Sequence, residues 1–128
     1  MDRNELEGRL RKFSGLVNDI IESLPNTYFG NNLAQQLSRS GLSPLLNYAE
    51  GQSAESRKDF IHKLKIVLKE LRETFAGLKL IKEAKLLNSS KTLDYALDEN
   101  NQLISIFVKS VDTATKNNNK DKGKGSNK

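Results

Sequence analysis

The sequence predicts an all-α protein, an antiparallel up-down-up-down four-helix bundle followed by a disordered C-terminal tail. In four separate segments, apolar residues recur every three or four positions, as they do on one face of an α-helix. The connections between these segments are short, which favours antiparallel neighbours, and no segment alternates with the period of a β-strand. We therefore divide the chain into a bundle, residues 1–115, and a polar Lys/Asn-rich tail, residues 116–128.

The first helix is predicted from about Asn4 to Leu24. Proline disfavours the helical conformation in the residue before it, so Pro25 ends this helix. Its apolar stripe has spacings of three and four residues and consists of Leu6, Leu10, Phe13, Val17, Ile20 and Leu24.

The second helix is predicted from about Asn26 to Glu50, with Gly51 as a left-handed cap. Pro44 removes the amide that would bond the carbonyl of Ser40, so a bend is expected there. The apolar face consists of Leu33, Leu37, Gly41, Leu45, Tyr48 and Ala49.

The third helix opens with a predicted capping box, in which Ser56 caps the free amides and Asp59 reaches back, and it ends near Lys85. Its expected core face is Phe60, Leu64, Val67, Leu71, Phe75 and Leu78. The fourth helix starts after an N-cap at Asn88 or Ser89 and runs to about Thr115. Its inward residues are Leu93, Ala96, Leu103, Phe107, Val111 and Ala114.

The residue inventory argues against an enzyme. His62 is the only histidine and there is no cysteine, so no metal site with the usual ligand spacing can be assembled. No glycine-rich phosphate loop occurs. We expect no catalytic residues, no metal and no cofactor. Without an apolar segment of signal or membrane length, a cytoplasmic protein that does not contact membranes is expected.

Positive charge is concentrated in the tail. The net charge is +5, yet residues 116–128 hold five lysines and one aspartate, which leaves 16 basic and 15 acidic residues in 1–115. A nearly neutral bundle gives little support to nucleic-acid binding from bulk charge alone. The tail is either a solubilising end or an arm that contacts nucleic acid.

The third helix segregates its charges on two flanks. The basic flank, called the basic stripe below, consists of Lys58, His62, Lys65, Lys69 and Arg72, with Lys79 at its edge. The opposite flank carries Asp59, Glu70 and Glu73, with Ile66 among them. The basic stripe could contact phosphates, or it could be a solvated face balanced by acids on a neighbouring helix. A third alternative is a head-to-tail ring, in which the acidic flank meets the basic stripe of the next subunit and Ile66 is an apolar contact.

The second helix carries a polar stripe opposite its apolar face. We define the polar stripe as Gln36, Arg39, Ser43, Asn47 and Glu50. It is either a solvent face or a packing and assembly surface; the bend at Pro44 and the scarcity of charge favour the second. Arg39 and Glu50 are about three turns apart, so each needs a partner on another helix or another subunit.

The stretches "QLSRSGLSPLLNYAEG" and "SRKDFIHKLKIVLKELRET" resemble the four-helix-bundle proteins encoded in 23S ribosomal RNA intervening sequences. Pro44 stands one position earlier than is usual in that family, so the bend is displaced. The matching positions are Gln36, Leu37, Arg39, Ser43, Asn47, Ala49, Glu50, Gly51, Ser56, Phe60, Leu68, Glu70 and Leu71.

The resemblance implies a non-catalytic bundle that forms a homopentameric ring, often with a basic surface for nucleic acid. The same fold includes the accessory variability determinant proteins of diversity-generating retroelements, whose ring binds a reverse transcriptase and its RNA. Our leading hypothesis is a ring-forming bundle that binds RNA or DNA weakly through the basic stripe and the tail. The alternatives are an accessory subunit of a reverse transcriptase and a purely structural oligomer.

Overall fold

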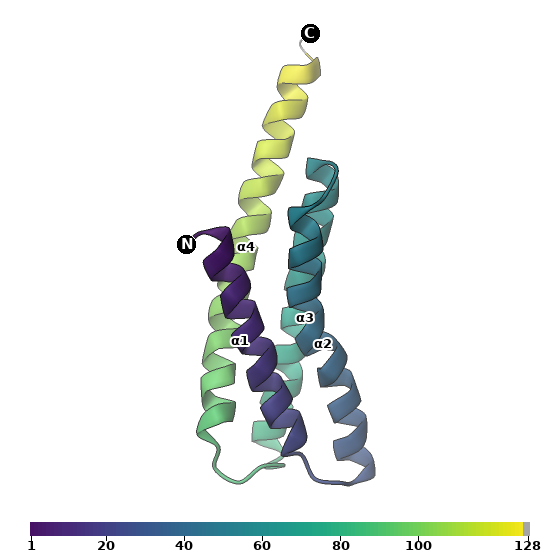
Figure 1. The fold of residues 1–128 in the computed structure, drawn as a ribbon, viewed down its shortest axis with the longest axis vertical. Coiled ribbons are helices and arrows are strands. Elements are labelled where there is room, and N and C mark those ends of the chain that lie inside the picture. The colour runs from purple at the N-terminus through teal and green to yellow at the C-terminus, as the bar shows by residue number, and fades with distance from the viewer. Residues whose placement is uncertain (127–128) are drawn as a thin grey trace.

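A computed structural model describes the backbone of residues 1–126 and the side chains of residues 1–120. Its four α-helices are α1 (Arg3–Glu22), α2 (Tyr28–Gln52), α3 (Arg57–Glu83) and α4 (Lys91–Ser126). Consecutive helices run in opposite directions, and α4 returns beside α1 to close the bundle (Figure 1). Within the described residues, the backbones of the diagonal helix pairs, α1 with α3 and α2 with α4, do not approach closely. The predicted fold class is confirmed.

Side-chain caps decide where the helices begin. The Ser56 hydroxyl accepts a hydrogen bond from the Asp59 amide at 3.1 Å, which confirms Ser56 as the N-cap of α3. The starts of α2 and α4 lie later than predicted, whereas α1 begins at Arg3, one residue earlier than predicted. Thr27 caps α2, and Ser90 accepts from the Leu93 amide at 3.1 Å where Asn88 or Ser89 had been expected.

Gly51 is not a left-handed cap, and this prediction was wrong. The helix continues through Gly51 to Gln52, and none of the described glycines has a positive φ. A Cβ added at Gly51 would lie 3.2 Å from Cβ of Lys63 and 3.6 Å from Cδ1 of Phe60, both on α3. The glycine therefore allows the end of α2 to pack closely against α3 and does not form a turn.

The predicted end of the fourth helix near Thr115 was also wrong, because α4 continues to Ser126. Adding residues to an existing helix costs much less than nucleating one, and the segment contains no proline. An ion pair between Lys116 and Asp112 at 3.0 Å spans the predicted boundary at the favourable i,i+4 spacing. Within the predicted tail, Asn127 and Lys128 lie outside the described residues.

The core is built from apolar side chains of all four helices. Phe13 of α1, Leu37 of α2, Leu71 of α3 and Phe107 of α4 are at most 1% exposed. Tyr48 packs edge-to-face against the ring of Phe107, with ring centroids 5.6 Å apart. Most residues of the predicted apolar stripes thus form the core or pack against it. Phe75 and Ala49 were predicted wrongly, because both are half-buried outside the core cluster. None of the helices in residues 1–126 is long and apolar enough to cross a membrane.

Small residues set the closest approaches between helices. A Cβ at Gly41 of α2 would lie 2.7 Å from Cγ1 of Val17 on α1. One turn further on, Pro44 is buried inside α2 and cannot donate a backbone hydrogen bond. The Ser14 hydroxyl of α1 donates to the Gly41 carbonyl at 2.8 Å. Pro44 leaves the Ser40 carbonyl without its helical donor, and the donor from α1 reaches the next carbonyl in the chain, that of Gly41.

Candidate nucleic-acid interface

The basic stripe lies on the exposed surface of α3. Lys58, His62, Lys65, Lys69 and Arg72 are all exposed. Among the side chains that the structure describes, Lys58, Lys65, Lys69 and Arg72 form no ion pair. These four cations extend over about 21 Å of helix axis, at 1.5 Å per residue. Their ammonium and guanidinium groups are available to an anionic partner.

Two other lysines of α3, outside the basic stripe, do form ion pairs. Lys63 pairs with Glu50 of α2, and Lys82 pairs with Asp94 of α4 at 2.8 Å. Lys79, the edge residue of the basic stripe, is engaged differently, since its Nζ lies 4.7 Å from the centroid of the Phe75 ring. The acids of the neighbouring helices therefore pair with lysines outside the central part of the basic stripe.

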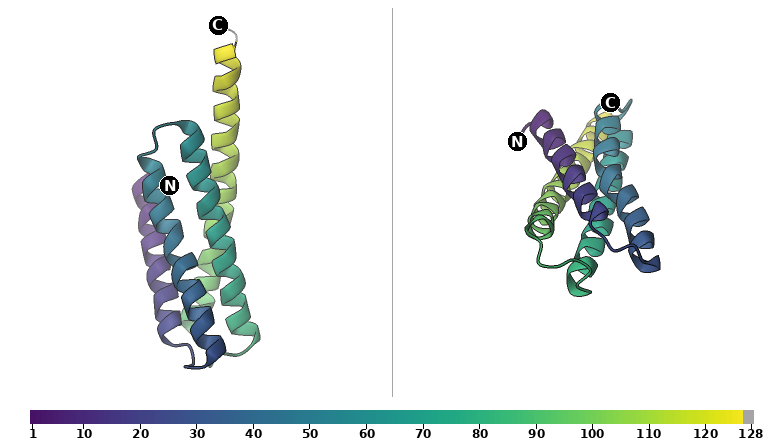
Figure 2. Two further views of the ribbon diagram at one scale, coloured as in Figure 1. Left: turned by 90° about the vertical axis from the view of Figure 1, so that its right-hand side faces the viewer. Right: turned by 60° about the horizontal axis from the view of Figure 1, so that its bottom comes forward.

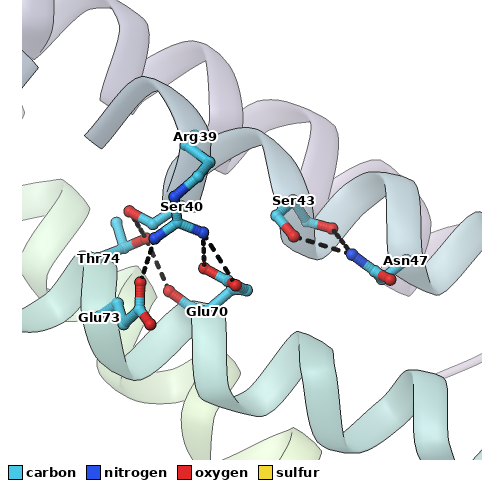
Figure 3. A network of polar contacts seen from close by, with 7 residues as sticks. All are labelled: Arg39, Ser40, Ser43, Asn47, Glu70, Glu73 and Thr74. Carbon is cyan, nitrogen blue, oxygen red and sulfur yellow. Dashed lines mark hydrogen bonds and ion pairs between the residues drawn. The ribbon is translucent and has the colours of Figure 1, made fainter. Parts of the chain in front are cut away.

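Two of the three acids on the acidic flank of α3, Glu70 and Glu73, are paired within the chain. The guanidinium of Arg39 donates to both carboxylate oxygens of Glu70, at 2.9 and 3.0 Å, and to Glu73 (Figure 3). The hydrogen bonds from Glu73 and Glu70 raise the pKa of Arg39. The Glu70 side chain is only 8% exposed, so this carboxylate is not available to the basic stripe of another subunit.

Next to this cluster, two hydroxyl groups meet between α2 and α3. The Thr74 hydroxyl lies 2.9 Å from the Ser40 hydroxyl and 2.9 Å from the carbonyl oxygen of Glu70 (Figure 3). Both side chains are buried. Because buried polar groups need hydrogen-bond partners, this contact specifies how the two helices align.

The remaining members of the polar stripe are placed as follows. Asn47 donates to the hydroxyl and the carbonyl of Ser43, at 2.8 and 3.0 Å, and both side chains are half-buried (Figure 3). Glu50 pairs with Lys63 of α3, whereas Gln36 is exposed. On α3, Ile66 is half-buried. The structure thus places the partners of Arg39 and Glu50 on another helix of the same chain.

Asn100 of α4 was missed in the sequence. It is fully buried, and its Nδ2 donates to the Leu71 carbonyl of α3 at 3.0 Å. Its Oδ1 has no hydrogen-bond partner among the described residues. The signal was present, because Asn100 continues the three-and-four spacing between Ala96 and Leu103. Asn100 was not predicted to be buried because the core positions were predicted from apolar residues only.

Carboxylates and the single histidine do not gather into a metal site. Within the described residues, no group of three or more His, Cys, Asp or Glu side chains is close enough to hold a metal ion. What the described part of α3 does offer is a row of exposed cations.

Residues 8–109 match the sequence profile of the 23S rRNA-intervening sequence protein family. The chain is also similar to a crystal structure from Bacteroides thetaiotaomicron, a protein of unknown function from the S23 ribosomal protein family. The two share 25% sequence identity with a TM-score of 0.77, over 88% of this chain and 99% of the other. No curated protein matches the chain.

Proposed function

The chain belongs to the 23S rRNA-intervening sequence protein family, and from this premise we propose that it is a non-catalytic bundle that binds RNA or DNA weakly. The observation that supports this proposal is the row of exposed cations on α3, Lys58, Lys65, Lys69 and Arg72, without ion pairs among the described side chains. Cations in this arrangement bind phosphates and release condensed counterions, independently of base sequence.

The excess of basic over acidic side chains along the basic stripe supports the proposal. A solvated helix face normally balances its lysines with acids three or four residues away. On α3 the acids Glu70 and Glu73 bind Arg39 of α2, and Glu73 also lines a groove together with Lys65, Lys69 and Arg72. These three cations share one carboxylate that is already paired, so the basic stripe keeps an excess of positive charge.

A salt titration tests the proposal. Binding of a fluorescent RNA of arbitrary sequence, followed by anisotropy between about 20 and 200 mM KCl, should weaken steeply as salt rises. If three or four phosphates are contacted, the slope of log K against log salt is about −2 to −4. No detectable binding at the lowest salt would refute the proposal.

The chain offers a matched pair of variants for the same titration. Lys65→Ala should reduce the magnitude of the slope by about one, because one phosphate contact is lost. Lys63→Ala removes the same charge only two residues away, but Lys63 is already paired with Glu50. It should leave the slope nearly unchanged. Equal effects of the two variants would mean that net charge, rather than the basic stripe, governs binding.

We also propose that copies of the chain assemble through the outer face of α2. Leu42 and Leu46 are four residues apart on this helix, and they are 47% and 49% exposed. A groove of about 150 Å³ beside Leu42 is lined by residues of α1 and α2, including Val17, Ile21 and Leu37. Exposed apolar side chains next to such a groove favour contact with another polypeptide.

Light scattering tests this assembly. The wild-type chain should be an oligomer, and the double variant Leu42→Ser with Leu46→Ser should be a monomer. A wild-type monomer at high concentration would refute assembly.

A further inference from the structure

Helix α4 brings polar side chains to one end of the basic stripe. Because α4 runs antiparallel to α3 and continues past Thr115, the part of α4 around Thr115 lies beside the first turns of α3, and its last turns extend beyond the connection between α2 and α3 (Figure 2). A cleft of about 260 Å³ opens between them. Its walls are Lys58, Ile61, His62 and Lys65 of α3 and Thr115 and Asn118 of α4.

The lining of this cleft is suited to an anion. Two ammonium groups and an imidazole come from α3, and a hydroxyl and a carboxamide come from α4. Ile61 is buried and forms the apolar floor, and none of the six lining residues is acidic. A water occupies about 30 Å³ in the liquid, so the cleft has room for a phosphate group with several waters.

The side chains that α4 contributes are not satisfied elsewhere. Thr115 and Asn118 are half-buried, and neither side chain forms a hydrogen bond with another described residue. Two serines of α4 behave differently, because Ser105 and Ser110 donate to the carbonyls of Asn101 and Ile106, one turn earlier, at 3.3 and 2.9 Å. Half-buried polar groups without partners are expected to bind water or a ligand.

We propose that this cleft seats a phosphate group of the bound nucleic acid, so that α4 contacts the ligand together with α3. The inference rests on the proposed function and adds a defined position to it. Lys58 and Lys65 supply the charge, whereas the Thr115 hydroxyl and the Asn118 amide donate hydrogen bonds to phosphate oxygens. The phosphate is either an internal phosphodiester or a terminal phosphomonoester, because both present non-bridging oxygens.

A variant that keeps the net charge tests this cleft. Thr115→Val combined with Asn118→Leu removes two donors and leaves every cation in place. RNA affinity should fall about tenfold, the equivalent of two modest hydrogen bonds, while the slope of log K against log salt stays the same. The control is Thr113→Val with Asn117→Leu, which makes the same chemical changes in a different groove of α4. The control should bind like the wild type.

The outcomes separate the inference from the proposed function. If the Thr115/Asn118 variant binds like the wild type while Lys65→Ala weakens binding, the cleft is not used and the inference is overturned, but the proposed function stands. If the wild type binds no RNA at low salt, the proposed function fails and the inference fails with it. A fall of equal size in the control would also count against the cleft.

Two further measurements make the test independent of folding effects in the variants. In the ¹⁵N-labelled wild-type chain, the Asn118 side-chain amide should shift on addition of the RNA, and the Asn117 amide should not. Comparing the same RNA with a 5′-hydroxyl and with a 5′-phosphate shows whether the cleft binds an internal phosphodiester or a terminal phosphomonoester. An equal loss of affinity in the variant with both RNAs assigns an internal phosphodiester, and a loss only with the 5′-phosphate assigns a terminal one. An Asn118 amide that does not shift would overturn the inference.

Discussion

The guanidinium of Arg39 on α2 holds the carboxylate of Glu70 on α3 with two hydrogen bonds, at 2.9 and 3.0 Å. Glu70 is nearly buried, whereas about half of the Arg39 side chain is exposed. The two partners of this ion pair therefore differ in how much they depend on each other. A carboxylate that folding has removed from water depends on a cation that remains partly solvated.

Arg39→Ala should destabilise the bundle more than Glu50→Ala does. The first substitution leaves the carboxylate of Glu70 without its cation, whereas Glu50 and its partner Lys63 both lie near the solvent. Urea unfolding followed by circular dichroism should give a clearly lower midpoint for Arg39→Ala and a midpoint close to wild type for Glu50→Ala. Equal midpoints would show that Glu70 is well solvated without Arg39.

Gly41→Ala should destabilise the protein by about 1 kcal/mol, although alanine is the better helix former. The new Cβ would lie 2.7 Å from Cγ1 of Val17, a stiff β-branched side chain that is 1% exposed. Gly15→Ala is the matched control, since nothing lies within 4 Å of its added Cβ. It should stabilise the protein by about 0.5–1 kcal/mol. Combining Gly41→Ala with Val17→Ala should cost less than the sum of the single effects, and strict additivity would contradict the close contact.

Asn100→Asp should destabilise the bundle by about 3 kcal/mol or more at neutral pH. The substitution keeps the shape of the side chain but removes the donor to the Leu71 carbonyl and places a carboxyl group in the core. Burial raises the pKa of such a carboxyl group above its ordinary value of about 4. The folded state then prefers the protonated form, so the stability deficit should grow as the pH rises from about 4 to 7. A deficit that does not change with pH would contradict this.

Stability should fall above about pH 10 because of Tyr48. Burial raises the pKa of Tyr48 above its ordinary value of 10.0, so the folded state holds this proton more tightly than the unfolded chain does. The stabilising contribution is complete below pH 10.0 and is lost as the pH rises through the folded pKa. Tyr48→Phe should flatten this part of the pH profile. Tyr95→Phe is the control, because Tyr95 is 63% exposed and should leave the profile unchanged.

The apolar spacing in the sequence was sufficient for the number of helices, their directions and most of the core. It was less informative at positions where a small or polar residue is buried. Gly51 was predicted wrongly as a left-handed cap, and Asn100 was not assigned to the core because only apolar residues were considered there. In both cases the neighbouring helix decides the role of the residue, and local propensity does not.

The four-helix fold and the separation of charges on α3 can be predicted from the sequence alone, because both depend on the regular spacing of residues along one helix. Which charges are paired depends on the contacts between helices. Arg39 reaches the acidic flank from α2, whereas no described acid pairs with Lys58, Lys65, Lys69 or Arg72. Likewise, the cleft beside Asn118 exists because α4 continues along α3. Contacts between helices depend on their relative depth and register, which the spacing within a single helix does not specify.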